Sequence, residues 1–169
     1  MLVMKFGGTS VGSTERITAV AKIVHERLDK KPVVVVSAIA GVTNALIETA
    51  NEKTQTARIA KLESIRAKHE TIVAELGLEA DLLDAEFEEL ENVASDSKKL
   101  DKKKLDLYVS FGERLCAMIL AATLRRMDVN AKAFPAWDLG MITDDVHGGA
   151  EPLSDSPTHI REKIFALKA

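Results

Sequence analysis

The sequence predicts an α/β fold built on a mainly parallel sheet, with a pair of helices inserted into it. The 169-residue chain begins with a short apolar run, an amphipathic helical pattern and a second apolar run, in that order. The second run, residues 33–36, consists of four valines, which is typical of a strand buried on both faces in a parallel sheet. Residues 54–97 carry no strand pattern and are rich in Glu, Lys and Ala, which indicates helices.

The first three elements form a strand–helix–strand unit. Leu2–Phe6 is expected to form a short buried strand, and residues 14–30 a helix. The helix is predicted from apolar residues that recur on one face at spacings of three and four, namely Ile17, Val20, Ala21, Val24 and Leu28. The valine strand follows Pro32, so the order implies a right-handed crossover between two parallel strands.

Both predicted strands end in loops that contain glycine and hydroxyl residues. Lys5 precedes the first loop, residues 7–10, and the second loop covers residues 37–44. Glycine lets the backbone approach an anion, and lysine adds a compact positive charge. The order matches neither G-x-x-x-x-G-K-[ST] nor G-x-G-x-x-G, and a plain strand-to-helix turn with a surface lysine is the local alternative. Because ligands bind beyond the carboxyl ends of parallel strands, the two loops together favour a binding site.

The middle of the chain is predicted to be helical. A helix is expected over residues 42–52, and residues 54–97 are expected to form a helical hairpin whose first helix ends at Gly77. Apolar residues at helical spacing mark its two helices, Ile59, Leu62, Ile65, Ile72 and Leu76 in the first and Leu82, Leu83, Phe87, Leu90 and Val93 in the second. The charged residues of the hairpin are expected on solvated faces.

A further helix is expected from residue 101 or 105 to residue 127. It contains Gly112, and a glycine inside a helix costs about 1 kcal/mol relative to alanine. Close approach of another backbone or a ligand would explain this glycine, and so would a kink. Glu113 beside it lies between apolar residues, and Cys116 is expected to be a small core residue.

The last part of the chain continues the α/β pattern. Residues 130–136 are expected to form a third strand, and residues 140–145 a short hairpin or edge strand. A loop is expected at residues 147–149, and a final helix at residues 158–167.

Composition excludes several classes of protein. The formal net charge of −3 argues against a general binder of nucleic acid or of anionic membranes, although a local basic pocket is compatible with it. One cysteine permits neither an intrachain disulfide nor a cysteine metal cluster, in keeping with a cytoplasmic protein. The sequence shows no signal peptide or membrane span. His25 and His69 lack partners at metal-ligand spacing and are expected at the surface or its boundary.

Four segments, in order, resemble one known family, the aspartate kinases. Residues 5–11 (KFGGTSV) resemble its KFGGTSV signature, and residues 37–44 (SAIAGVTN) its SAxxGxTN loop. Residues 111–114 (FGER) resemble its (S/H)xGE helix start, and residues 144–152 (DDVHGGAEP) the segment after its third strand. The resemblance covers essentially the whole chain. It implies a three-layer α/β/α fold with a mainly parallel sheet, as in amino acid kinases.

The same resemblance implies that residues 1–169 are the N-terminal, substrate-side portion of an amino acid kinase domain, with a helical insertion at about residues 54–97. The family continues with PVxxGFxG, RGGSDxTA and DVDGVYTADPR-like segments and with regulatory ACT domains, none of which occurs here. The nucleotide-binding half is therefore expected to be absent. We expect the isolated chain to be inactive, and to form a homo-oligomer or to bind a complementary C-terminal half.

The implied reaction is the ATP-dependent phosphorylation of the β-carboxylate of L-aspartate, the first step toward lysine, threonine and methionine. Lys5 is the implied catalytic residue, because its charge would neutralise the phosphoryl group in transfer. Gly7, Gly8 and Thr9 would join Lys5 in holding the phosphates of ATP. Mg²⁺ would bridge the nucleotide phosphates, but no metal ligand is expected in this portion.

The resemblance also implies an aspartate site. Thr43 would donate a hydrogen bond to a substrate carboxylate, and Glu113 would accept one from the α-ammonium. Ser37 and Ser10 are further candidates for the phosphate or aspartate edge. The alternative for Glu113 is a structural carboxylate whose hydrogen bonds are satisfied within its helix.

Two other functions compete with this assignment. The first is another amino acid kinase, acting on glutamate, acetylglutamate, carbamate or UMP. The second is a non-catalytic fragment or subunit that needs a complementary half. A substrate panel on a complete kinase separates the first from aspartate kinase, and an assay of the chain alone addresses the second.

Overall fold

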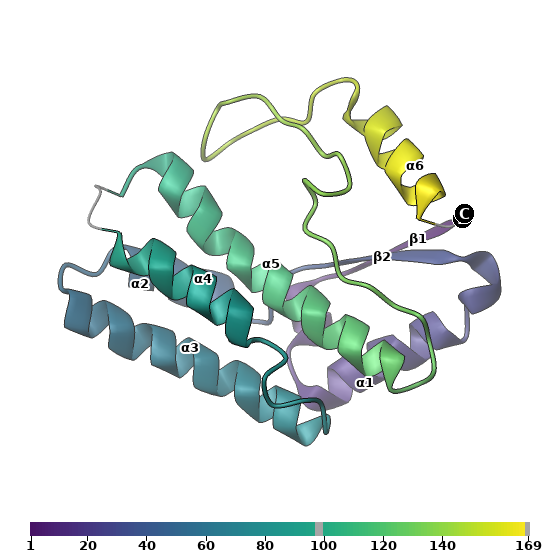
Figure 1. Cartoon of the computed structure of the whole chain (residues 1–169), viewed down its shortest axis with the longest axis horizontal. Helices are drawn as coiled ribbons and strands as arrows, with labels where there is room; N and C mark the ends of the chain where they lie inside the picture. Colours follow the sequence, from purple (N-terminus) through teal and green to yellow (C-terminus); the bar gives the residue numbers. More distant parts are fainter. Residues whose placement is uncertain (97–99, 168–169) are drawn as a thin grey trace. The chain divides into compact units, whose positions relative to one another are not determined.

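The computed structural model describes residues 1–96 and 100–167. Those residues fall into two compact units, Met1–Ala133 and Phe134–Ala169. The first unit holds the sheet and helices α1 to α5, and the second holds helix α6 (Figure 1). Ser97, the expected end of the helical hairpin, lies outside the described residues.

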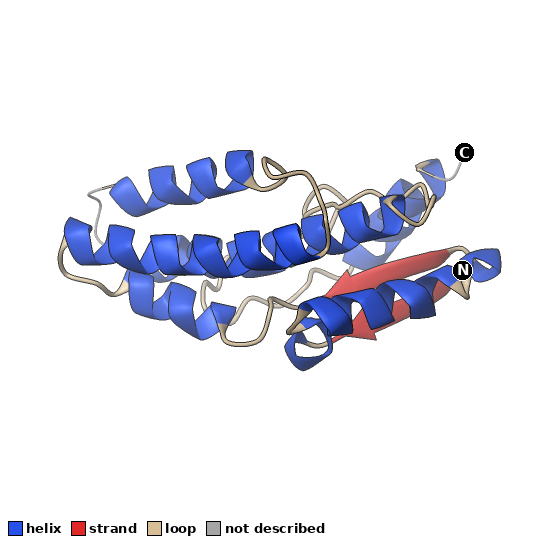
Figure 2. Ribbon diagram, turned by 90° about the horizontal axis from the view of Figure 1, so that it is seen from below, coloured by secondary structure: helices blue, strands red, loops and turns tan. Residues whose placement is uncertain are grey.

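The first unit begins with the predicted strand–helix–strand arrangement. Strands β1 (Leu2–Phe6) and β2 (Pro32–Val36) pair in parallel, in register from Leu2 opposite Pro32 to Phe6 opposite Val36. Figure 2 shows the two arrows side by side and pointing the same way. Helix α1 (Thr14–His25) and the short 3-10 helix η2 (Leu28–Lys30) connect them, so the predicted single helix is divided near its end.

The two faces of this sheet differ. Met4, Phe6 and Val34 are among the residues that pack against the hydrophobic core on one face. On the other face Val3 is 60% exposed and Val35 46% exposed. The expectation of a valine strand buried on both faces is therefore wrong for the first unit, because its helices cover only the face that carries Met4 and Phe6.

Four helices complete the first unit. They are α2 (Val42–Ala50), α3 (Gln55–Glu75), α4 (Asp84–Ser95) and α5 (Lys102–Arg125), all within the stretches expected to be helical. Helices α3 and α4 lie against each other, and α5 packs on α1, α2 and α4 (Figure 1). Helix α5 is long and apolar enough to cross a membrane by length and composition alone. Most of that stretch is buried, as in the core helix of a globular protein.

Helix α3 ends where the sequence predicts. Gly77 has a φ of +62°, and Leu78 N–H donates to the Val73 carbonyl at 3.0 Å, which together form a Schellman motif. Arg126, on the turn after α5, donates to the Leu76 and Gly77 carbonyls. The end of the first hairpin helix is thereby attached to the end of the central helix.

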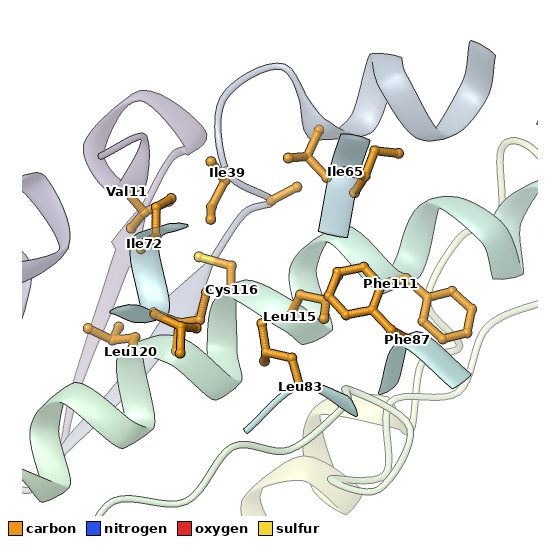
Figure 3. Packing of buried hydrophobic residues seen from close by; sticks show 14 of the residues in the cluster. Val11, Ile39, Ile65, Ile72, Leu83, Phe87, Phe111, Leu115, Cys116 and Leu120 are labelled. Atoms are coloured by element: carbon orange, nitrogen blue, oxygen red, sulfur yellow. The ribbon is translucent and has the colours of Figure 1, made fainter. Parts of the chain in front are cut away.

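The core shown in Figure 3 is formed by the helices together with the loop after each strand. Ile39 comes from the loop after β2, Ile65 from α3, Phe87 from α4 and Leu115 from α5. Cys116 lies among them, and burial raises the pKa of its thiol to about 12. The prediction that Cys116 is a core residue is confirmed.

His69 also belongs to this core, so its expected surface or boundary position is wrong. Its side chain is fully buried on α3, and Nδ1 lies 2.7 Å from the Ile65 carbonyl oxygen. The imidazole meets the Phe87 ring edge-on, with ring centroids 5.7 Å apart. Burial lowers the pKa of His69, so the neutral imidazole is favoured. Because the Ile65 carbonyl, one turn earlier on α3, is a hydrogen-bond partner for Nδ1, the polar imidazole of His69 can be buried in the core.

The last part of the chain, from residue 130 across the end of the first unit, contains less regular structure than expected. Residues 130–136 form no strand, so the predicted third strand is wrong. Their only aromatic residue, Phe134, is followed by Pro135, which has no N–H for a ladder, and no described strand pairs with them.

The expected hairpin at residues 140–145 is reduced to one antiparallel bridge between Thr143 and Pro152. The predicted final helix forms as α6 (Ser156–Ala166). Ser156 Oγ accepts from Ile142 N–H at 2.9 Å and donates to the Ile142 carbonyl. Ser156 thus attaches the start of α6 to Ile142, the residue before the Thr143 bridge.

Candidate functional site

The candidate site lies where β1 and β2 end. Ser37 N–H donates to the Phe6 carbonyl at 3.1 Å, which extends the parallel pairing by one residue. Beyond that bond the first loop turns into the 3-10 helix η1 (Gly8–Val11), and the second loop leads into α2. The adjacent loops that the parallel strand order predicts are therefore present.

The first loop contacts the second at Gly8, and Gly12, just after the first loop, also approaches the second loop. A Cβ atom on Gly8 would lie 2.7 Å from the Ala38 carbonyl oxygen, a distance that real Cβ atoms essentially never show. A Cβ on Gly12 would lie 3.3 Å from the Ala40 Cβ, which is tighter than nearly all real contacts. These glycines allow the backbones of the two loops to approach closely.

Helix α5 contacts the second loop through the Gly-Glu pair. A Cβ on Gly112 would lie 2.7 Å from the Ala38 Cβ, so the close approach of another segment explains this glycine. Glu113 Oε1 accepts a hydrogen bond from the Ala38 N–H at 3.2 Å. Glu113 is therefore at the second loop, and one of its oxygens accepts a hydrogen bond from the loop backbone.

Lys5 lies beside the first loop. It is on the exposed face of β1, in register with Val35, and its Nζ is 3.7 Å from the position a Gly7 Cβ would occupy. No acidic side chain in the described part of the chain forms an ion pair with Lys5. An ammonium group is thus available next to a glycine backbone, an arrangement that suits an anion.

The second loop presents backbone donors. Gly41 precedes α2 with a φ of +84°, and no side chain caps the helix. Val42 N–H donates to the Ile39 carbonyl at 2.9 Å, whereas the N–H groups of Ala40 and Gly41 have no acceptor among the described residues. Thr43 is exposed on the first turn of α2, where helix N–H groups lack intrahelical partners.

The remaining predicted residues occupy the same two loops. Ser37 is half-buried at the end of β2, and Thr9 and Ser10 are exposed on η1. The structure thus brings Lys5 and Gly7 together, and links the second loop to Glu113, but shows no contact of the Thr9 or Ser10 side chain with the second loop.

The sequence interpretation missed two basic residues at these loops. Arg16, on α1, donates to the Thr9 carbonyl, and Lys68, on α3, donates to the Ala40 carbonyl at 2.7 Å. Arg16 is only seven residues from Thr9, so its proximity was a detectable signal. Lys68 is 28 residues from Ala40 on a helix whose charges were assigned to solvent, and no sequence pattern marks it.

The donors at the two loops are N–H groups, an ammonium group and hydroxyl groups. They suit an anion rather than Mg²⁺, which prefers oxygen ligands from carboxylates and phosphates. Within residues 1–96 and 100–167, no group of three or more His, Cys, Asp and Glu residues could hold a metal ion.

In the second unit, Asp144 stabilises a loop through hydrogen bonds to its backbone. Asp144 Oδ1 accepts from Val146 N–H at 3.1 Å and from Glu151 N–H at 3.2 Å. Asp144 N–H in turn donates to the Glu151 carbonyl at 3.0 Å. This aspartate closes the loop that contains the Gly-Gly pair.

Known proteins resemble the chain in sequence. It is 36% identical to the chloroplastic aspartokinase 3 of Arabidopsis thaliana over 96% of its own length and 31% of that relative. It is 30% identical to the aspartokinase of Rickettsia bellii over 89% of its length and 28% of that relative. The chain thus spans about a third of the length of the curated relatives it matches.

Solved structures resemble it in fold. Escherichia coli aspartokinase III in complex with aspartate and ADP matches 99% of the chain, and 37% of that structure, with a TM-score of 0.82 and 30% identity. The same enzyme in complex with lysine and aspartate matches with a TM-score of 0.81. These matches confirm the predicted α/β fold class. The model of the amino acid kinase family matches residues 1–163, and the chain therefore belongs to the amino acid kinase family.

Proposed function

We propose that this chain supplies the phosphate loop and the aspartate site of an ATP-dependent aspartate kinase. The observation that carries the proposal is the contact between the first loop, at Gly8 next to Lys5, and the second loop, which α5 contacts through Glu113. The similarity to aspartokinases, one of which binds aspartate and ADP, supports this choice of substrates.

The first loop suits the phosphoryl group. Phosphoryl transfer relies on positioning and charge neutralisation, so the protein needs fixed positive groups near the transferred phosphate. Lys5 would supply a full positive charge, and the backbone N–H groups of Gly7 and Gly8 would supply directed donors. Thr9 and Ser10 would add hydroxyl donors at the same turn. Mg²⁺ would travel with the nucleotide phosphates, since no ligand set for it is present among the described residues.

The second loop suits the amino acid. Thr43 and Ser37 would donate to the substrate carboxylates from the two ends of this loop. Glu113 would accept from the α-ammonium with the oxygen that does not accept from Ala38 N–H. The loop backbone and the substrate would thus share one carboxylate, which couples substrate binding to loop position.

We propose that the isolated chain has no kinase activity, because the segments that would enclose the adenine and ribose of ATP lie outside it. The apolar side chains of Val3 and Val35 remain exposed on the open face of the sheet. Such a face favours association with a complementary half or with a second copy of the chain. Steady ADP release by the isolated chain with ATP, Mg²⁺ and L-aspartate would contradict this part of the proposal.

Binding by the isolated chain is testable by NMR. Amide spectra of the ¹⁵N-labelled chain are recorded with L-aspartate, with ATP and Mg²⁺, and with L-glutamate, N-acetyl-L-glutamate, carbamate and UMP. We expect L-aspartate to shift the amides of Ala38 and Thr43, and ATP to shift those of Gly7 and Gly8. A response to one of the other acceptors, without a response to aspartate, would favour a different amino acid kinase.

Glu113→Gln sharpens this test. Glutamine still accepts from the Ala38 N–H but lacks the charge that would bind an ammonium group. We expect the variant to bind L-aspartate about tenfold more weakly, as for loss of a charged hydrogen bond. The control Glu63→Gln removes an exposed carboxylate on α3 and should bind like the wild type. Equal aspartate affinity in all three proteins would remove Glu113 from the site.

A further inference from the structure

We propose that Lys68 is a positioning residue that sets the orientation of the 40–41 peptide in the second loop and so links the helical hairpin to the substrate site. The inference rests on the proposed function for the identity of the ligand. The orientation of the peptide itself depends only on contacts within the first unit.

The contact is specific to one peptide group. Lys68 Nζ donates to the Ala40 carbonyl at 2.7 Å, and it lies 3.9 Å from the position a Gly41 Cβ would occupy. Ala40 in turn lies against the first loop, where a Gly8 Cβ would be 3.7 Å from its nitrogen, and its own Cβ is 3.3 Å from the position of a Gly12 Cβ just after that loop. One ammonium group from α3 therefore holds the residue at which the two loops meet.

Holding this carbonyl orients a donor. The C=O and N–H of a trans peptide point in opposite directions, and all peptide bonds of the described residues are trans. With the Ala40 oxygen held toward Lys68, the Gly41 N–H is directed away from Lys68. That N–H has no acceptor among the described residues, so it is available to a ligand. The left-handed φ of Gly41 permits this arrangement without a Cβ penalty.

The base of the Lys68 side chain is well anchored. His69, the next residue, is fully buried against Phe87, and Ile65 and Ile72 on the same helix are also buried. Helix α3 therefore cannot rotate freely about its axis, and Lys68 extends from a fixed edge of the hairpin. This anchoring reduces the freedom lost when the ammonium group binds the loop carbonyl.

The same helix offers a matched control. Lys61 is a lysine on α3 whose Nζ pairs with Glu52 at 2.6 Å and with Glu48 at 3.7 Å, away from the second loop. Lys61→Met and Lys68→Met remove the same charge from the same helix and keep an apolar stem. Only Lys68→Met removes a donor from the Ala40 carbonyl.

The first measurement uses the ligand-free chain. Hydrogen exchange of the Val42 amide, which donates to the Ile39 carbonyl, reports opening of the turn that contains the 40–41 peptide. We expect Lys68→Met to raise this exchange rate about fivefold, as for loss of one hydrogen bond. Lys68→Arg should restore the slow rate, and Lys61→Met should leave it unchanged. An unchanged rate in Lys68→Met would overturn the proposal.

The second measurement uses ligand. The affinity for L-aspartate is measured in each variant by the NMR titration, and urea unfolding checks that global stability is equal. We expect about fivefold weaker binding for Lys68→Met, rescued by Lys68→Arg. Wild-type affinity in Lys68→Met would refute the link to the substrate site. If the wild type itself binds no aspartate, the proposed function fails for this chain, while the exchange measurement still decides whether Lys68 orients the loop.

Discussion

Gly112→Ala tests the packing of helix α5 against the second loop. The new Cβ would lie 2.7 Å from the Ala38 Cβ, whereas ordinary contacts begin near 3.4 Å, so one of the two segments must move. Overpacking of this kind costs about 1–3 kcal/mol. Alanine in a helix is favoured over glycine by about 1 kcal/mol, so we expect a net loss of about 1 kcal/mol.

A double-mutant cycle with Ala38→Gly isolates the contribution of the contact between residues 38 and 112. Ala38→Gly removes the methyl group that the new Cβ would strike, at a cost of its own from lost burial and added backbone freedom. In the Ala38→Gly background, Gly112→Ala should become stabilising by up to about 1 kcal/mol, because only its helix propensity remains. The effect of one substitution thus changes sign with the other.

Urea unfolding followed by far-ultraviolet circular dichroism measures the four stabilities. Ala117→Gly, at a half-buried position on α5, calibrates the glycine–alanine difference in this helix. A Gly112→Ala effect that is equal in both backgrounds would refute the contact with Ala38. The reasoning would also fail if Gly112→Ala stabilised the wild-type chain by as much as Ala117→Gly destabilises it.

Three further predictions concern other parts of the first unit. Because burial lowers the pKa of His69 below its value in the unfolded chain, the unfolded state binds its proton first as pH falls. The stability from neutral His69 is therefore present above the unfolded pKa of about 6.5 and is lost on acidification, so urea midpoints should fall from pH 7.5 to pH 5. His69→Gln should flatten this dependence and the exposed His25→Gln should not; equal slopes in both variants would contradict the burial argument. Gly77→Ala should destabilise the chain by about 1 kcal/mol or more in urea unfolding, because φ is positive and a Cβ would strike the Arg126 guanidinium. A neutral result would show that the helix end relaxes freely. Cys116 should react with a thiol reagent only as fast as the chain opens, because its side chain is buried and burial raises the pKa of its thiol to about 12, so that very little thiolate forms at neutral pH. Rapid labelling of the folded chain would place this thiol at the surface.

Local patterns were sufficient for most of the elements. The short apolar run of Leu2–Phe6, the valine run and the helical spacing of the hairpin each predicted the element that forms. Gly77 marked a helix end because its left-handed conformation is a local backbone requirement. The same local reasoning failed at residues 130–136, because a strand exists only when another strand pairs with it.

The candidate site was predictable to the extent that chain order implies it. Two parallel strands place their loops at one edge, so the proximity of Gly8 to the second loop followed from topology. The burial of His69 was not predictable, because an imidazole becomes a core residue only when a carbonyl and an aromatic edge are available to it. Arg16 and Lys68 were likewise missed, since their hydrogen bonds to loop carbonyls depend on how helices pack.

The sequence by itself determined the elements of the strand–helix–strand unit and of the helical hairpin, because each element depends on residues close together in the chain. It also determined that the two glycine loops share one sheet edge, because the two strands run in parallel. Only the tertiary structure decided that the Ala38 side chain packs against Gly112. It also decided that Glu113 accepts a hydrogen bond from the Ala38 N–H, and that Lys68 on α3 donates one to the Ala40 carbonyl. Those contacts join segments 28 and 75 residues apart, and their geometry follows from the packing of whole helices rather than from any local preference.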